Sequence, residues 1–115
     1  LYRLAGAADL FLLPYPNLEQ VSSGTLSYAL ALGKAVLSTP FRHARAALAA
    51  GRGVLLPLEE EAWAQAVLAL AESPERLREM EERAYAYARD FTWPRVARAY
   101  RRLLEEVADV RPRVA

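Results

Sequence analysis

Three short, mostly apolar runs, each closed by a proline, constrain the fold of this chain more than any other feature. They cover residues 10–14, 35–40 and 54–57. An apolar run without polar alternation is typical of a strand buried on both faces, as in parallel sheets. Segments with helical character separate the runs. The order strand, helix, strand, helix, strand predicts βαβ units with right-handed crossovers and a parallel sheet.

Glycine, proline and capping residues mark where the helices begin and end. Residues 1–8 read as the tail of a helix, and a second helix is expected over residues 23–32, with Gly33 in the position just past its end. Residues 42–50 form an Ala-rich helix, and residues 51–53 form a turn. From residue 59 onward the pattern predicts helices alone, in three segments.

The three C-terminal helices each carry an apolar stripe on an otherwise charged surface. They are expected from about 59 to 72, from 73 to 90, and from 92 onward. Arginine and glutamate alternate along the last two, which is typical of a solvated, salt-bridged face and not of a nucleic-acid footprint. The stripe of the last helix consists of Val96, Tyr100, Leu103, Leu104 and Val107.

These elements predict an α/β fold, a partial Rossmann-like domain with about three parallel strands, helices on its faces and a C-terminal run of three helices. Doubly wound nucleotide-binding domains usually have five or six strands, with the ligand at the carboxyl ends of the strands. We therefore interpret residues 1–110 as about half of such a domain and residues 111–115 as a frayed tail.

Composition excludes several classes of site. The chain has no cysteine and a single histidine, so we expect no disulfide, no metal and no thiol chemistry. A net charge of +1 is too small to attract nucleic acid or a lipid surface. The apolar runs are far shorter than a membrane span, and the first residues lack the order of a signal peptide, which favours the cytoplasm. No cofactor is indicated.

The segment with the strongest chemical signal is the loop after the first strand. Ser22, Ser23, Gly24 and Thr25 lie where the carboxyl end of a strand meets the amino end of a helix. Backbone N–H groups, the helix dipole and hydroxyl groups favour an anion there, and glycine allows close backbone approach. These residues could also form only a helix cap, and the residues alone favour that interpretation.

Three further stretches point to a known family. Gly33-Lys34-Ala35-Val36 and Gly51-Arg52-Gly53-Val54-Leu55-Leu56-Pro57 stand at the end of a helix and at the turn into a strand, and Phe91-Thr92-Trp93 precedes the last helix. Over nearly the whole chain this order resembles the C-terminal domain of family 4 retaining glycosyltransferases of the GT-B architecture. The resemblance implies binding of a nucleotide-diphosphate sugar of the UDP or GDP type, and transfer of the sugar to an acceptor hydroxyl.

The loop itself departs from the family's Glu-x7-Glu pattern. Counting from Glu19 reaches Ser27, and an ungapped alignment on Gly33-Lys34 places Gln20 and Tyr28 at the two glutamate positions. The resemblance implies that the second glutamate of the pattern holds the donor ribose, so ribose recognition in this chain is altered, absent, or handled by Glu19, Ser27 or Tyr28. The sequence Ser22 to Thr25 resembles a subgroup with Ser-Gly-Thr in the loop, which makes phosphate binding the leading interpretation.

The resemblance also sets an expectation about activity. In that family the acceptor-binding domain and the basic pair that neutralises the leaving diphosphate precede the part that this chain matches. We therefore expect no catalytic residue here and no transfer by the chain alone. Two alternatives stay open: a module that oligomerises through an exposed sheet edge, for instance into a homodimer, and a remnant of such a domain without a ligand.

Other polar residues carry weaker signals. Gly33-Lys34 lacks the glycine and the hydroxyl residue of a P-loop, so it reads as a helix end. The lone His43 is interpreted as structural, although it could line the crevice. Arg42 and Arg45 could reach a diphosphate, but an arginine-rich surface is the commoner explanation.

Overall fold

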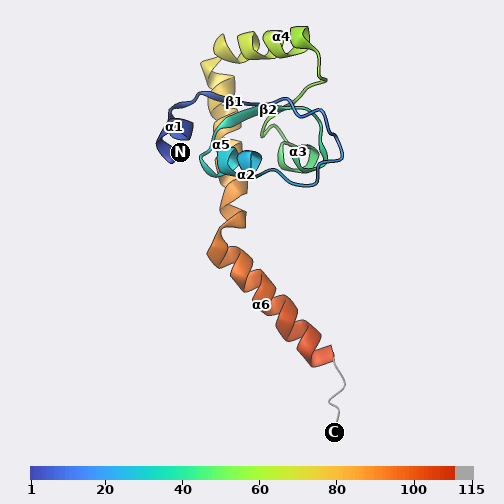
Figure 1. Cartoon of the computed structure of the whole chain (residues 1–115). Helices are drawn as coiled ribbons and strands as arrows, with labels where there is room; N and C mark the ends of the chain where they lie inside the picture. The colour runs from blue at the N-terminus through green and yellow to red at the C-terminus, as the bar shows by residue number, and fades with distance from the viewer. Residues whose placement is uncertain (111–115) are drawn as a thin grey trace.

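A computed structural model describes residues 1–110 of the chain, which form a small α/β body and a projecting C-terminal helix (Figure 1). The predicted tail at residues 111–115 lies outside the described residues. The elements, in chain order, are α1 (Tyr2–Ala7), β1 (Leu10–Leu13), α2 (Gly24–Ala31), β2 (Ala35–Ser38), α3 (Arg42–Ala47), β3 (Val54–Leu55), α4 (Glu60–Ala71), α5 (Pro74–Ala88), the 3-10 turn η1 (Arg89–Phe91) and α6 (Trp93–Val110).

The three strands form one parallel sheet in the order β1-β2-β3. Leu10 lies opposite Ala35, and Leu37 lies opposite Val54. The helices flank the sheet and the last ones follow in a run, so the prediction of a partial Rossmann-like α/β fold is confirmed. The third strand is shorter than expected, because the ladder ends at the Leu56 N–H, which donates to the Ser38 carbonyl (2.8 Å), and Pro57 has no N–H to extend it.

Two apolar clusters cover the two faces of the sheet. Val36 points toward α2 and α3, where Leu26 and Phe41 are fully buried. Ala35 and Leu37 point the other way, toward α4 and α5. Figure 1 shows α4 on one side of the sheet, α2 and α3 on the other, and α5 running past the strands between them. As a central strand, β2 is buried along its whole length, as the sequence predicts.

The prediction that the first strand is buried on both faces is wrong for β1. Leu13 is buried, but Leu12 is 49% exposed. β1 lies at the edge of the sheet, where helices α4 and α5 reach Leu10 and leave Leu12 uncovered. The position of β1 at the edge of the sheet thus decides the burial of its side chains, and an apolar run in the sequence does not reveal that position.

The end of α2 is set by Gly33, as predicted. Gly33 has φ +66, a left-handed conformation that L side chains rarely adopt. The N–H of Gly33 donates to Leu30 (3.0 Å) and that of Lys34 donates to Ala29 (2.9 Å), which is the Schellman pattern. A Cβ on Gly33 would lie 3.0 Å from the Tyr85 side chain of α5, so the same glycine also allows α5 to pack closely.

Helix α6 begins after Thr92, as the sequence predicts, but its apolar stripe does not enter the body. Tyr100, Leu103, Leu104 and Val107 are all exposed. Figure 1 shows α6 extending away from the sheet and from the other helices. Among the described residues, none of the helices has the combination of length and apolar character required to cross a membrane.

Candidate functional site

The loop that leaves β1 folds back over the carboxyl ends of β1 and β2. The Thr39 N–H donates to the Leu13 carbonyl (3.2 Å), and the Thr39 hydroxyl donates to the Tyr15 carbonyl (2.6 Å). Tyr15 in turn shares a hydrogen bond of 3.3 Å between its hydroxyl and Ser23 Oγ. These contacts fix the loop to the edge of the sheet at the carboxyl ends of the strands, and they position Ser23 at the start of α2.

Ser23 is the N-cap of α2, and its backbone and hydroxyl organise the first turn of the helix. Its backbone is extended (φ −141, ψ 119), and Oγ accepts from the Leu26 N–H (3.2 Å). Within residues 1–110, the N–H groups of Gly24 and Thr25 have no hydrogen-bond acceptor. Two amides and the positive end of the helix dipole therefore face outward together, an arrangement that favours an anion.

His43 lies beside this turn and accepts a hydrogen bond from it. The Ser23 N–H donates to His43 Nδ1 (3.0 Å), which requires the imidazole to be unprotonated at that nitrogen. Partial burial lowers the pKa of His43, because desolvation disfavours the charged form. His43 thus orders the loop by occupying one amide. The expectation that it is structural agrees with this contact, but its ring also lines the cavity described next.

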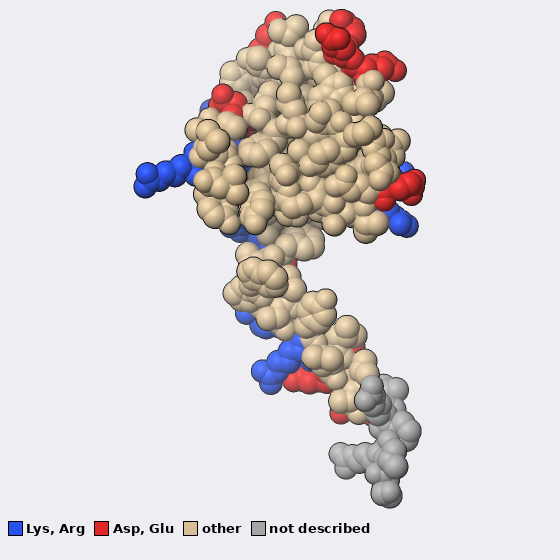
Figure 2. Space-filling view, viewed as in Figure 1, with Lys and Arg blue, Asp and Glu red and all other residues tan. Residues whose placement is uncertain are grey.

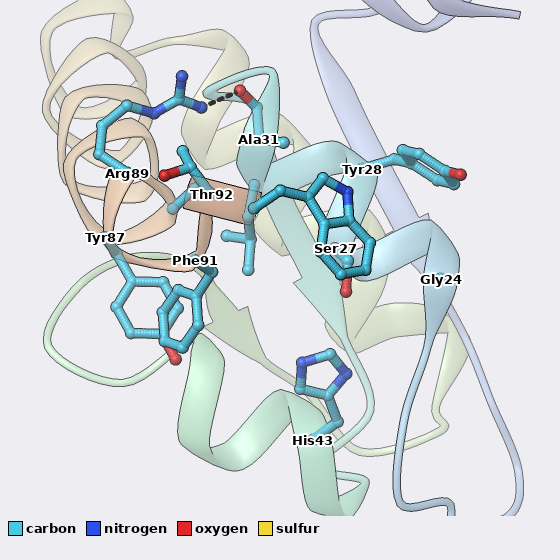
Figure 3. A pocket seen from close by; sticks show the side chains of 12 residues that line it. Gly24, Ser27, Tyr28, Ala31, His43, Tyr87, Arg89, Phe91 and Thr92 are labelled. Atoms are coloured by element: carbon cyan, nitrogen blue, oxygen red, sulfur yellow. Dashed lines mark hydrogen bonds between the residues drawn. The ribbon is translucent and has the colours of Figure 1, made fainter. Parts of the chain in front are cut away.

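An open cavity of about 530 Å³ begins at the N-terminal turn of α2. Figure 3 shows Gly24 and Ser27 on one side of it, His43 below, and Tyr87 and Phe91 on the far side. The rings of Tyr87 and Phe91 pack against each other, with 4.8 Å between their centres. The wall of the cavity is mainly apolar and aromatic, and it comes from α2, α3 and the corner between α5 and α6. The residues that line it are Gly24, Ser27, Tyr28, Leu30, Ala31, His43, Tyr87, Ala88, Arg89, Phe91, Thr92 and Trp93.

At the far end of the cavity, Arg89 stabilises the end of α2. Its Nη2 donates to the Ala31 carbonyl (2.6 Å, dashed in Figure 3), and its guanidinium lies 4.0 Å from the centre of the Tyr85 ring. A cation at the C-terminus of a helix is favourable, and a stacked guanidinium is held in place. Arg89, the first residue of η1, therefore joins the end of α5 to the C-terminus of α2.

The structure brings three of the eight predicted site residues into this cavity. Gly24, Ser27 and Tyr28 line it. Ser27 Oγ donates to the Ser23 carbonyl (3.1 Å), so its oxygen can still accept a hydrogen bond. The other five predicted residues lie on the loop and the first turn beside it, outside the lining: Glu19, Gln20, Ser22, Ser23 and Thr25.

Among those five, only Ser23 is buried. Gln20 Nε2 donates to the Ser22 carbonyl (2.8 Å), and the Glu19 N–H donates to Asn17 Oδ1 (3.1 Å), so the loop is internally hydrogen-bonded. The Thr25 amide follows that of Gly24 in the first turn of α2, where backbone N–H groups have no intrahelical acceptor. Glu19 and Thr25 are exposed.

Sequence reasoning missed the aromatic wall. Tyr87, Phe91 and Trp93 lie more than 50 residues from the loop in the chain, and α5 carries them to it. The Phe91-x-Trp93 pattern was a visible signal, but it marked the start of a helix and not a ligand wall. Within the described residues, no group of three or more acidic or histidine side chains is placed to hold a metal ion.

The chain was compared with protein-family models, with curated proteins and with solved structures, and no match was found in any of the three.

Proposed function

We propose that this chain binds the donor of a glycosyltransferase, a nucleotide-diphosphate sugar of the UDP or GDP type, with the diphosphate at the N-terminus of α2. One observation carries the proposal: the cavity is lined at one end by Gly24, the first residue of α2, whose amide has no acceptor within residues 1–110, and it continues along α2 into an aromatic wall. A site for phosphate next to a cavity with aromatic walls is the combination that a nucleotide requires.

The phosphate end depends on backbone groups. A Cβ built on Gly24 would meet no atom within 4 Å, so a ligand can approach the backbone closely there. The amides and the helix dipole supply partial positive charge without a mobile side chain. The same charge would stabilise a leaving diphosphate, whereas the acceptor hydroxyl has to be aligned by other groups.

The nucleoside end depends on aromatic side chains. Tyr28, Phe91 and Trp93 are exposed at the cavity, and Tyr87 is half-buried behind them. Stacking of a base on such rings contributes about 1–3 kcal/mol in nucleic-acid complexes. A volume of about 530 Å³ is within the range of small-molecule sites, roughly 300–1,000 Å³. The choice of glycosyl transfer over other nucleotide chemistry rests on the sequence resemblance.

The test compares two substitutions of Gly24, the first residue of α2. Proline at this position removes one of the two amides, fits the first turn of a helix, and is compatible with the extended backbone of Ser23 before it. Alanine keeps the amide and has room for its methyl group. Isothermal titration with UDP and GDP is expected to show at least a tenfold loss of affinity for Gly24→Pro and a change below threefold for Gly24→Ala, from the loss of one charge-assisted hydrogen bond of about 1.5–3 kcal/mol.

Absence of heat at millimolar UDP and GDP, together with no competition between them, would refute the donor site. Equal losses in the two variants would show that steric filling, and not the amide, accounts for the effect.

The strand order supports a second candidate, a module that associates through the edge of the sheet. β1 pairs with β2 alone, and exposed Leu12 stands on it. Unpaired edge groups recruit other strands. Leu12→Lys should then dissociate any oligomer seen by light scattering, and a chain that stays monomeric at high micromolar concentration would remove this candidate.

A further inference from the structure

The imidazole of His43 is held between the loop and the cavity. Its Nδ1 accepts the Ser23 N–H at 3.0 Å, and the ring meets the fully buried Phe41 edge to face, with 6.5 Å between the ring centres. His43 also belongs to the lining of the cavity, and Figure 3 shows its ring pointing into the space between Gly24 and Phe91. Contacts on two sides therefore fix the position of this ring.

The hydrogen bond from Ser23 determines which ring nitrogen carries the proton. A neutral imidazole has one N–H group, and Nδ1 has to be without a proton to accept, so the proton lies on Nε2. Partial burial lowers the pKa of His43 and so favours this neutral form. His43 thus presents an N–H donor at Nε2 in a single tautomer.

The Nε2 donor has no partner in the protein and is accessible. Within residues 1–110, the hydrogen bond of His43 is the one at Nδ1, and Nε2 makes none. Arg89 Nε is the one buried side-chain nitrogen or oxygen without a partner in this part of the chain. Since Nε2 of the half-buried His43 also lacks a partner, it is not among the buried atoms, and a ligand in the cavity can reach it.

The cavity has no cationic side chain at the end where α2 begins. Arg89 is the cationic residue in the lining, and its guanidinium donates to a carbonyl at the C-terminal end of α2. Figure 2 shows the face of the body over α2 and α3 as tan, with charged side chains at its margins. The Ser27 hydroxyl already donates within the first turn of α2. An anion at the Gly24 amide therefore has to be held by neutral donors.

We propose that His43 binds the ligand of this cavity directly, with Nε2–H donating to an oxygen of the diphosphate that lies at the Gly24 amide. His43 takes this role within the nucleotide site proposed above, on which the assignment rests. Ser23 directly precedes Gly24, and one carbon separates the two ring nitrogens, so Nε2 and the Gly24 amide lie within reach of one diphosphate. The Ser23 amide also polarises the ring through Nδ1 and strengthens Nε2–H as a donor, because linked hydrogen bonds reinforce one another.

The first test measures the tautomer of the free chain and needs no ligand. His43 is the only histidine of the chain, so long-range proton–nitrogen correlation of the untagged, isotope-labelled protein shows one imidazole without overlap. At about pH 8, above the ordinary pKa of the group, we expect the pattern of a proton on Nε2 alone. A proton on Nδ1, or a mixture of both tautomers, would overturn the proposal whether or not a nucleotide binds.

The second test separates the two nitrogens with two substitutions. The oxygen of asparagine can take the place of Nδ1, and the amide of glutamine can take the place of Nε2. Isothermal titration with UDP at about pH 8 should show at least about a tenfold loss of affinity for His43→Asn, because a hydrogen bond to a charged group is lost. His43→Gln should bind UDP more tightly than His43→Asn, although thermal denaturation should show that it is the less stable variant.

Uridine tests which part of the ligand His43 contacts. It has no phosphate, so its affinity, measured by NMR titration, should change less than about threefold in His43→Asn. An equal loss for uridine and UDP would place His43 against the nucleoside and overturn the proposal.

Two further results would leave His43 a structural residue and overturn the proposal while the nucleotide site stands. One is an equal affinity for UDP in the wild-type chain and His43→Asn, and the other is a set of UDP affinities that follows the order of the stabilities. A wild-type chain that binds no UDP would remove the nucleotide site and this contact together.

Discussion

Removing the Ser23 hydroxyl tests whether the first turn of α2 is built as the hydrogen bonds indicate. Ser23 is 5% exposed, and its Oγ accepts from the Leu26 N–H and contacts the Tyr15 hydroxyl. Loss of an N-cap costs about 1 kcal/mol, within a range of 0.5–2 kcal/mol. Tyr15 is half-buried, so the loss of its partner adds at most about 1 kcal/mol.

Ser23→Ala should therefore lower the free energy of unfolding by about 1–2 kcal/mol. For a chain of this length this corresponds to a fall in Tm of roughly 4–8 °C, measured by thermal denaturation followed at 222 nm by circular dichroism. Ser22→Ala is the matched control, because Ser22 is exposed and the hydrogen bond from Gln20 goes to its backbone carbonyl. It should change stability by less than about 0.5 kcal/mol. Equal effects at both serines would refute the capping role.

Three further outcomes follow from the same contacts. Burial lowers the pKa of His43 below its ordinary value of 6.5, so the folded chain binds fewer protons than the unfolded chain. The free energy of unfolding is therefore full above about pH 6.5 and falls below it. His43→Asn keeps a hydrogen-bond acceptor and does not titrate, so it should flatten this fall in urea melts between pH 7 and 5. Gly33→Ala should lower the free energy of unfolding, measured by chemical denaturation, by about 1–2 kcal/mol, because φ is +66 and Tyr85 is adjacent. Gly6→Ala is the control: no atom lies within 4 Å of the added methyl group, so this variant should not lower the free energy of unfolding. Trp93→Ala should leave the Tm unchanged and reduce UDP affinity about tenfold in titration calorimetry, and an unchanged affinity would exclude Trp93 from the base site.

Local signals in the sequence were sufficient to predict the order of the helices and strands. Gly33 after an apolar helix identifies the end of α2, and its left-handed backbone confirms the reason. Burial was less predictable, because it depends on which elements cover which face. Leu12 and Leu37 both stand in apolar runs, yet only Leu37, in the central strand, is covered from both sides. The same difficulty applies to α6, where a periodic stripe predicts a helix but not its partner.

For the candidate site, the sequence could locate the loop but not the cavity. Ser23 and Gly24 stand at the carboxyl end of a predicted strand, and their types predict a helix start without any tertiary information. The aromatic wall requires the path of α5, which passes the sheet and turns at Phe91. The contact of His43 with the Ser23 amide depends on the angle at which α3 follows β2, and no residue pattern in that segment encodes it.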